Sequence, residues 1–419
     1  MTVAASTGAS LRQPAGGPPG RDRILFTTLY FAEGVPIGFL WWALPSVLRE
    51  QSVEVGRITT LTAALAVPWT LKFLAGPAID RSVARGARLR NWILGCQLAM
   101  GFALLPLAAN ESLPGFRLLF ALLLVHACFA AVQDVAIDAL CIRSVPVDRL
   151  GNINGWMQFG MTAGRAVAAA SVPMIIYAAG WQPAIGAIVA LVWLPMLVVV
   201  LMVREPPRPK DRVTDGGSGL GRLLSRALVP AMGVALLAGA GFEAVGALSG
   251  PLLVDLRFEP ALRSAFFGAI APLGLATGGL LAALIADRLG LRRAVAVGVL
   301  GSAVAATALG YSVSADTLPV GRISHLALFG AVYLGAGFLI SASYACFMSV
   351  VRGSWAATRF SLLMALTNAC ESASALIAGR LVAPMGYGGA LLALAGLSVF
   401  SLPFLRKLDL TGVKAHADK

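Results

Sequence analysis

The sequence has few charged residues for its length. Asp, Glu, Lys and Arg make up 13% of its 419 residues, whereas hydrophobic residues make up 58%. Soluble globular domains carry roughly 25% charged residues, so this composition excludes a soluble domain as the main part of the chain. The sequence therefore predicts an integral membrane protein.

Histidines and catalytic motifs are also scarce. Of the three histidines, His325 lies near the edge of a predicted helix and His416 lies in the C-terminal tail. The sequence contains no H-E-x-x-H, G-x-S-x-G or P-loop pattern, which argues against a metalloprotease, a serine hydrolase and an ATP-driven pump. The five cysteines lack the spacing of a zinc site or a disulfide framework. We therefore expect no enzyme activity, no metal and no cofactor.

Long apolar stretches are the main feature that is present. A helix needs roughly 20 residues to cross a hydrocarbon core of ~30 Å, and the chain contains twelve such stretches without strand-like alternation. The sequence predicts an all-α polytopic membrane protein with twelve transmembrane helices. The first six span residues 24–47, 58–79, 92–108, 116–142, 153–178 and 183–203. The other six span residues 227–254, 261–286, 294–313, 324–351, 360–383 and 386–405.

The basic residues are distributed unevenly among the loops. The tails and the loops after even-numbered helices hold 24 lysines and arginines, whereas the loops after odd-numbered helices hold six. Cytoplasmic loops of membrane proteins carry the excess of basic residues. We therefore predict that both termini are cytoplasmic. We also expect the chain to lie in the inner membrane of a bacterium. The net charge of +13 then reflects orientation rather than nucleic-acid binding.

A polar stretch rich in Pro and Gly divides the chain. Residues 204–226 predict a cytoplasmic linker. It joins one six-helix bundle at residues 24–203 to a second at residues 227–405. Residues 1–23 and 406–419 are expected to be cytoplasmic tails, the first of them flexible.

One motif recurs after the second predicted helix of each half. The first copy reads GPAIDRSVARGARLR and the second reads ALIADRLGLRR. Both resemble the cytoplasmic G-x-x-x-D-R-x-G-R-R signature of the major facilitator superfamily. This resemblance implies two pseudo-symmetric six-helix bundles with a substrate site between them near the membrane midplane. It also implies a cytoplasmic gate that contains Asp80, Arg81, Asp287 and Arg288.

Other stretches are similar to the AmpG-type permeases and the related acetyl-CoA transporters. They are LYFAEGVPIGFLWWALPSVLRE followed by PWTLKFLAGPAIDR, then VQDVAIDAL and ATRFSLLMALTNA. This resemblance implies a proton-driven permease for muropeptides, siderophores or acyl-CoA. Uptake of an anionic or amphipathic solute such as a muropeptide is the main hypothesis, and siderophore or acyl-CoA transport is the alternative. A non-transporting receptor or assembly factor on the same scaffold is a further alternative.

Charged residues inside the predicted helices need a cavity or a partner. A charge at the bilayer centre costs about 2.5–3.5 kcal/mol on insertion scales. Glu33 and Glu243 lie 210 residues apart, at corresponding places in the two halves. Because a buried carboxyl group can load and unload a proton, we predict proton coupling by Glu33, Glu243 and Asp134. Neutral acids hydrogen-bonded to a neighbouring helix are the alternative.

Arg165 is the expected centre of substrate binding. An arginine stays protonated, and its planar fork suits a carboxylate or a phosphate. We predict that Arg165 binds the anionic group of the substrate and that Glu33, when ionised, competes for the guanidinium. A structural ion pair with Glu371 or Asp134 is the alternative. The other predicted substrate-binding residues are Gln158, Gln133, Trp41 and Glu371.

Asp138 and Lys72 complete the predicted gate. Asp138 lies four residues after Asp134, on the same helix face and nearer the cytoplasm. It is expected to pair with the basic loop that contains Arg81, whereas Lys72 either joins this gate or extends to the membrane interface. The expected partners are a small-molecule substrate, protons and the lipid bilayer, and we expect a monomer.

Overall fold

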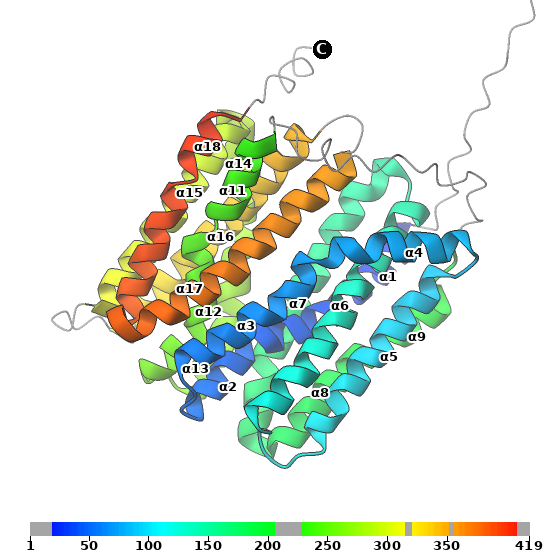
Figure 1. The fold of residues 1–419 in the computed structure, drawn as a ribbon, viewed down its shortest axis with the longest axis horizontal. Helices are drawn as coiled ribbons and strands as arrows, with labels where there is room; N and C mark the ends of the chain where they lie inside the picture. Colours follow the sequence, from blue (N-terminus) through cyan, green and yellow to red (C-terminus); the bar gives the residue numbers. More distant parts are fainter. Residues whose placement is uncertain (1–18, 206–227, 315–320, 352–355, 409–419) are drawn as a thin grey trace, which may run out of the picture.

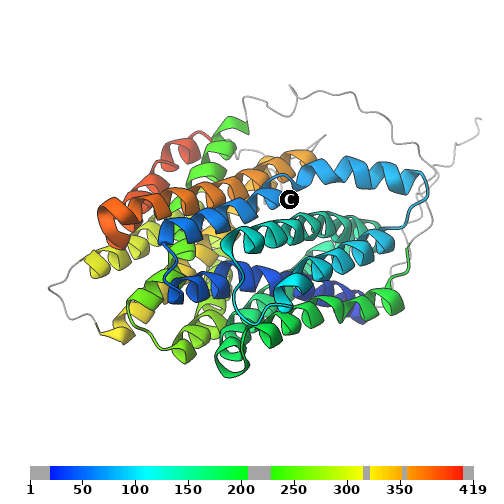
Figure 2. The same cartoon turned by 60° about the horizontal axis from the view of Figure 1, so that its bottom comes forward.

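The computed structural model describes residues 19–205, 228–314, 321–351 and 356–408. Most of both predicted tails and of the predicted linker lies outside these residues, as does His416. Within the described residues every regular element is helical. The helices run side by side in two groups, which follow each other along the chain (Figure 1, Figure 2).

The helices of each group follow the order of the sequence. The first group contains α1 (Pro19–Gly38), α2 (Leu44–Glu50), α3 (Val55–Thr70), α4 (Ala75–Ala84), α5 (Leu89–Ala108), α6 (Phe116–Ser144), α7 (Val147–Ala179), α8 (Trp181–Trp193) and α9 (Pro195–Met202). The second contains α11 (Val229–Leu237), α12 (Ala240–Asp255), α13 (Pro260–Ala265), α14 (Ala271–Leu289), α15 (Leu291–Ser314), α16 (Arg322–Val350), α17 (Ala356–Val399) and α18 (Leu402–Arg406).

The described residues cross the bilayer twelve times, as predicted. They contain 11 helices that are long and apolar enough to span a membrane. The last of these, Arg359–Arg406, has 48 residues, which at ~1.5 Å per residue is more than twice the length that a ~30 Å core requires. Gly386 divides it, because its φ of 69° lies in the left-handed region that glycine tolerates. The chain turns back at this point (Figure 1).

The connections alternate between two ends of the molecule. Those after α4, α6 and α14 lie at the end where α9 leads toward the linker, and we call this the linker end. Those after α2, α5, α7 and α12 lie at the other end, which we call the distal end. The first helix starts at the linker end at Pro19, so residues 19–23 are helical and the predicted tail is too long.

The second predicted helix is not continuous. It is interrupted between α3 and α4 by a short 3₁₀ turn at Lys72–Leu74. Pro77 explains the break, because proline has no N–H and its ring clashes with the carbonyl four residues earlier, that of Phe73. Helix α4 therefore restarts with Pro77 in its first turn. Lys72 lies in the break rather than on a regular helix.

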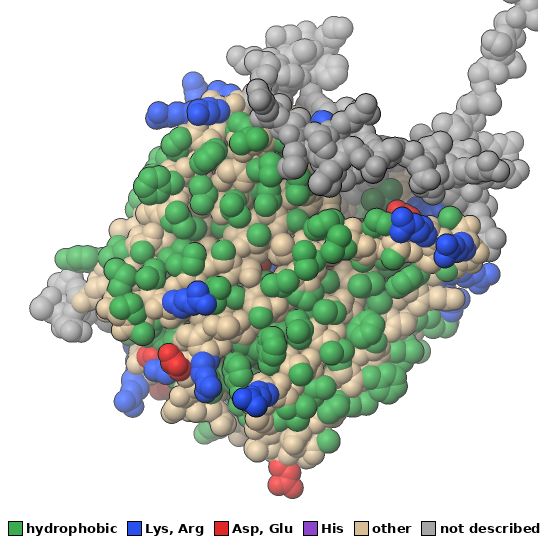
Figure 3. Space-filling model, viewed as in Figure 1, with side chains coloured by type: hydrophobic (Ala, Val, Ile, Leu, Met, Phe, Trp, Pro, Cys, Tyr) green, Lys and Arg blue, Asp and Glu red, His purple; other side chains and the backbone are tan. Residues whose placement is uncertain are grey.

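Side-chain exposure fits a chain surrounded by lipid. Many large apolar side chains of the helices are exposed, such as Leu201 at 77% and Leu280 at 71%. Figure 3 shows hydrophobic side chains spread over the face of the molecule, with most of the basic groups toward its margins. Exposed apolar surface of this extent marks a membrane contact.

Helix α7 packs directly on α1 and so fixes the position of Arg165. A Cβ atom at Gly38 would overlap the backbone of Arg165, and one at Gly164 would overlap the backbone of Phe31. Small residues allow such close approach of two helix backbones. The glycines on both helices therefore allow this close approach, and α1 is the neighbour of Arg165.

Candidate functional site

A central cavity of about 270 Å³ lies between the two groups of helices. The first group contributes residues from α1, α3 and α7, and the second contributes residues from α11, α12, α14, α16 and α17. The charged residues of the wall are Arg165, Glu243 and Glu371. The structure therefore brings four of the predicted site residues together from both halves: Arg165, Glu243, Glu371 and Trp41.

Arg165 faces this cavity without a direct ionic partner. None of the ion pairs among the described residues includes Arg165, and its Nε atom is buried without a hydrogen-bond partner there. Glu243 and Glu371 lie close enough to interact electrostatically with Arg165 and with each other. A guanidinium in this position needs an anion, because an uncompensated charge inside a membrane protein is costly.

Aromatic side chains form much of the remaining wall. Trp41 and Trp69 meet edge to face, with ring centroids 5.5 Å apart and an interplanar angle of 81°. Tyr333, Tyr344 and Phe242 line the same cavity. Tyrosine and tryptophan combine a large apolar face with a polar group. The cavity therefore suits a solute that is partly apolar and carries an anionic group.

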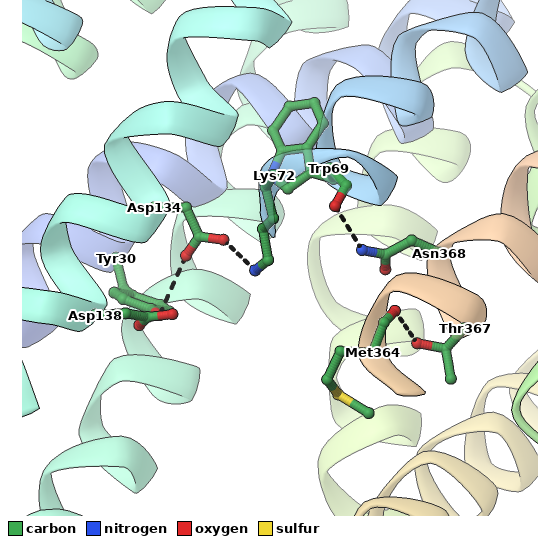
Figure 4. A network of polar contacts seen from close by, with 8 residues as sticks. All are labelled: Tyr30, Trp69, Lys72, Asp134, Asp138, Met364, Thr367 and Asn368. Carbon is green, nitrogen blue, oxygen red and sulfur yellow. Dashed lines mark hydrogen bonds and ion pairs between the residues drawn. The ribbon is translucent and has the colours of Figure 1, made fainter. Parts of the chain in front are cut away.

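A second group of charges lies within the first bundle, and we call it the acid cluster. It consists of Tyr30, Glu33, Lys72, Asp134 and Asp138. The Lys72 ammonium donates a hydrogen bond to Asp134 Oδ2. The Tyr30 hydroxyl lies 2.6 Å from Asp138 Oδ1 and 3.4 Å from Asp134 Oδ1. Figure 4 shows Lys72 directed at Asp134 and Tyr30 beside both aspartates.

Glu33 is the least paired member of the acid cluster. Its side chain is buried, and its Oε2 atom has no hydrogen-bond partner among the described residues. Trp69, which lines the central cavity, lies beside Glu33. The cluster contains three carboxyl groups but a single ammonium group. Since buried charges need compensation, this arrangement suits the storage of a proton.

The neighbours of Arg165 differ from those predicted. Glu33 interacts most strongly with Asp134, Lys72 and Asp138, whereas Arg165 acts on Glu243 and Glu371. The hypothesis that Glu33 competes for the guanidinium is therefore wrong, and Glu371 and Glu243 take its place. A direct pair of Arg165 with Asp134 is not present either, since Asp134 pairs with Lys72 and no ion pair among the described residues includes Arg165.

The predicted surroundings of Asp138 are also wrong. Its charged neighbours are Asp134 and Lys72, and Tyr30 donates a hydrogen bond to it. Arg81 is exposed. Lys72 takes the place expected for the loop arginines, because the helix break after α3 brings it to the acids. Lys72 therefore has an internal partner and does not extend to the interface.

Other predicted residues lie outside the central cavity. Gln133 is fully buried, and Gln158 is exposed. Gln158 shares a face with Arg165 but lies two helical turns, or ~10 Å, nearer the linker end. The motif residues Asp80, Arg81, Asp287 and Arg288 are exposed near the linker end of α4 and α14, so their role in a gate stays a prediction.

Several residues of the site were missed in the sequence, among them Asn368 and Tyr30. Asn368 lines the central cavity, and its Nδ2 atom donates to the carbonyl of Trp69 over 3.3 Å, which links α17 to α3. Tyr30 binds the aspartates of the acid cluster. Each precedes an intramembrane glutamate by three residues, Glu371 and Glu33 respectively. This i, i+3 spacing on a helix face is the signal that could have identified them.

Ion pairs join the two bundles at the distal end. Arg49 Nε lies 2.8 Å from Asp255 Oδ1, and the Tyr387 hydroxyl donates to Asp255 Oδ2 over 2.6 Å. Arg263 of α13 pairs with Glu50 of α2. In this conformation the distal end is held closed.

The sequence and the fold were compared with known proteins. The sequence model of the Major Facilitator Superfamily matches residues 26–379. The chain is 20% identical to a putative transporter AmpG 4 of Rickettsia conorii over 386 residues, which cover 86% of this chain and 90% of that protein. It is 25% identical to the anhydromuropeptide permease of Escherichia coli K12 over 375 residues, which cover 86% and 74%.

Solved structures share the fold. A D-xylose-proton symporter aligns with a TM-score of 0.74 at 13% identity, covering 93% of this chain and 97% of that one. A bacterial homolog of the human lysosomal transporter Spinster, in an inward-facing and unoccupied conformation, aligns with a TM-score of 0.70 at 15% identity, covering 94% and 98%.

Proposed function

The chain belongs to the major facilitator superfamily, and we propose that this multi-pass membrane transporter takes up an anionic or amphipathic solute such as a muropeptide, driven by a proton gradient. Proteins of this family are transporters of small molecules and not enzymes. The observation that carries the proposal is Arg165, a cation in the wall of the central cavity that has no direct ionic partner among the described residues.

The central cavity supports a solute of mixed chemistry. Arg165 offers a bidentate site for a carboxylate or phosphate, and Trp41 and Trp69 offer apolar faces. Glu243 and Glu371 are half-buried and can accept hydrogen bonds from amino or hydroxyl groups of the solute. A sugar linked to a peptide contains all of these groups, and two relatives named above are an anhydromuropeptide permease and a putative AmpG transporter.

The acid cluster supports proton coupling. Lys72 neutralises Asp134 and Tyr30 binds Asp138, so Glu33 is the acid left to carry the proton. Trp69 lies between Glu33 and the central cavity, because it neighbours Glu33 and lines the cavity wall. A change in the charge of Glu33 can therefore affect substrate binding through the side chain of Trp69.

The orientation is part of the same proposal. We expect the linker end to face the cytoplasm of a bacterium and the protein to act as a monomer, because the central cavity lies within one chain. A green fluorescent reporter fused after the C-terminus is expected to fluoresce, whereas a phosphatase fused there is expected to be inactive. An active phosphatase beside a dark fluorescent reporter would reverse the orientation.

Transport by purified protein tests the proposed substrate and energy source. In proteoliposomes, labelled anhydromuropeptide is expected to accumulate above its external concentration when the outside is acidified, and a protonophore is expected to abolish the accumulation. Accumulation that survives the protonophore would contradict proton coupling. A ferric siderophore and an acyl-CoA are offered in parallel, and accumulation of one of these instead would reassign the substrate.

A further inference from the structure

A second cavity, of about 120 Å³, lies near the distal end of the molecule. We call it the distal pocket. It is formed by α2 and α7 of the first bundle and by α13 of the second. Its charged residues are Glu50 and Arg263. Tyr177, which is 79% exposed, also lines it.

The distal pocket and the central cavity share a wall. Trp42 lines both of them. Its ring stacks on Phe267, with centroids 6.0 Å apart and an interplanar angle of 23°. Trp42 and Phe267 belong to the π-helical turns Phe39–Ala43 and Phe266–Ile270, which join α1 to α2 and α13 to α14. Such turns occur frequently at functional sites.

The ion pair in the distal pocket is asymmetric. The side chain of Arg263 is 9% exposed, whereas that of Glu50 is 43% exposed. Glu50 can therefore turn into water at small cost, but Arg263 cannot leave without stranding a buried cation. An anion that enters the pocket can therefore replace Glu50 as the partner of Arg263.

Two buried hydroxyl groups accompany Arg263. Ser46 and Ser264 line the pocket, and each is 5% exposed. Their Oγ atoms have no hydrogen-bond partner among the described residues. Buried hydroxyls normally have a partner, and rotation about χ1 allows each of these to donate to an oxyanion held by Arg263.

We propose that the distal pocket is a second anion site, in which the carboxylate or phosphate of an amphipathic molecule replaces Glu50 on Arg263. The proposal rests on the proposed function only in that the transported solute is such a molecule. A lipid headgroup has the same chemistry, and the experiment separates these two sources.

Occupation of this site has a mechanical consequence. Glu50 and Arg263 belong to different bundles, so their ion pair helps to hold the distal end closed. An anion that displaces Glu50 removes this link and leaves the ion pair of Asp255 with Arg49 between the bundles. Binding and opening of the distal end are then linked, because the ligand favours the state in which the pair is broken.

Distances between two spin labels at the distal end provide the test. The labels are placed on cysteines introduced at Ser112 of the first bundle and Glu259 of the second, both of which are exposed. Cys128 is replaced by serine, because it is the exposed cysteine among the described residues. The protein is held in phosphatidylcholine nanodiscs, and the probe is octyl phosphate, with octyl glucoside as the uncharged control.

The variants Glu50→Gln and Arg263→Gln form a matched pair. Both break the same ion pair, so both are expected to separate the labels in a larger fraction of molecules than in the parent. Octyl phosphate is expected to increase this fraction in the parent, whereas in Glu50→Gln the pair is already broken and the fraction is expected to change little. Calorimetry is expected to show that octyl phosphate binds about tenfold more tightly to Glu50→Gln than to the parent and does not bind to Arg263→Gln. Arg263→Gln is expected not to respond, and octyl glucoside is expected to act on none of them.

Three results would overturn the proposal. They are equal affinities of the two variants for octyl phosphate, a label response in Arg263→Gln as large as that of the parent, and the absence of any label response in the parent. If Arg263→Gln does not fold, Arg263→Lys replaces it and is expected to respond more weakly than the parent, because an ammonium lacks the bidentate fork.

Nanodiscs of phosphatidylglycerol identify the source of the anion. If a lipid headgroup occupies the distal pocket, these nanodiscs separate the labels without octyl phosphate, and Arg263→Gln removes the effect. If the solute occupies it, the lipid exchange has no effect. The label distances are measured in both kinds of nanodisc with Arg165 intact and without transport. Their outcome therefore does not depend on whether the proposed uptake function is correct.

Discussion

Arg165→Gln is expected to weaken substrate binding by roughly 30-fold to several thousand-fold. Loss of one partner of a buried charged hydrogen bond costs about 2–5 kcal/mol, and each ~1.4 kcal/mol corresponds to a tenfold change. The guanidinium lies in the wall of the central cavity with a buried Nε atom that lacks a partner in the described part of the chain. Equilibrium binding of labelled substrate to purified protein measures the effect.

Two further substitutions control this experiment. Arg165→Lys keeps the charge but loses the planar fork, so an intermediate affinity is expected. Arg380→Gln removes an exposed arginine of α17 that does not line the central cavity, and it is expected to leave affinity within about twofold because surface substitutions have small effects. If Arg165→Gln binds substrate as the parent does but unfolds at lower temperature, Arg165 is instead a structural partner of Glu371.

Glu33→Gln is expected to abolish concentrative uptake while leaving exchange intact. The glutamine resembles the protonated carboxylic acid in size and cannot release a proton. The central cavity keeps Arg165, Glu243 and Glu371, so substrate still binds. In proteoliposomes, labelled substrate should exchange with unlabelled substrate at a rate near that of the parent. An inward proton gradient should produce no accumulation above equilibrium, in contrast to the parent.

The contrast with other acids makes this result specific. Glu54→Gln alters an exposed acid at the distal end and should accumulate substrate normally. Asp134→Asn leaves Lys72 without its partner, and loss of one member of a buried ion pair destabilises a protein by about 3–5 kcal/mol. This variant should therefore lose thermal stability, which Glu33→Gln should not. Normal accumulation by Glu33→Gln would show that another member of the acid cluster, or Glu243, carries the proton.

Both experiments depend on residues that lie far apart in the sequence, and the sequence predicted only part of their arrangement. Arg165, Glu243 and Glu371 were each identified as charges inside predicted helices, and the structure gathers them in one cavity. Glu33 was expected beside Arg165 and at a place equivalent to that of Glu243, which lies 210 residues further along the chain. The halves are not equivalent here, since Glu33 is buried among acids of its own bundle and Glu243 faces the cavity.

The sequence by itself determined the membrane class, the twelve crossings and the division into two halves. Each follows from local properties of the chain, because an apolar stretch of sufficient length spans a bilayer whatever its neighbours are. The position of the repeated motif could also be predicted from the sequence, since both copies lie at the linker end of the second helix in their halves.

The tertiary structure alone decided which charges meet. Lys72 reaches Asp134 because Pro77 interrupts the helix before α4, and Arg165 faces Glu243 and Glu371 because α7 packs on α1 and turns toward the second bundle. The pair of Glu50 with Arg263 requires two bundles to close on each other. Such contacts depend on the rotation and packing of helices that are distant in sequence, and helical periodicity specifies the face of a residue but not its neighbour across the interface.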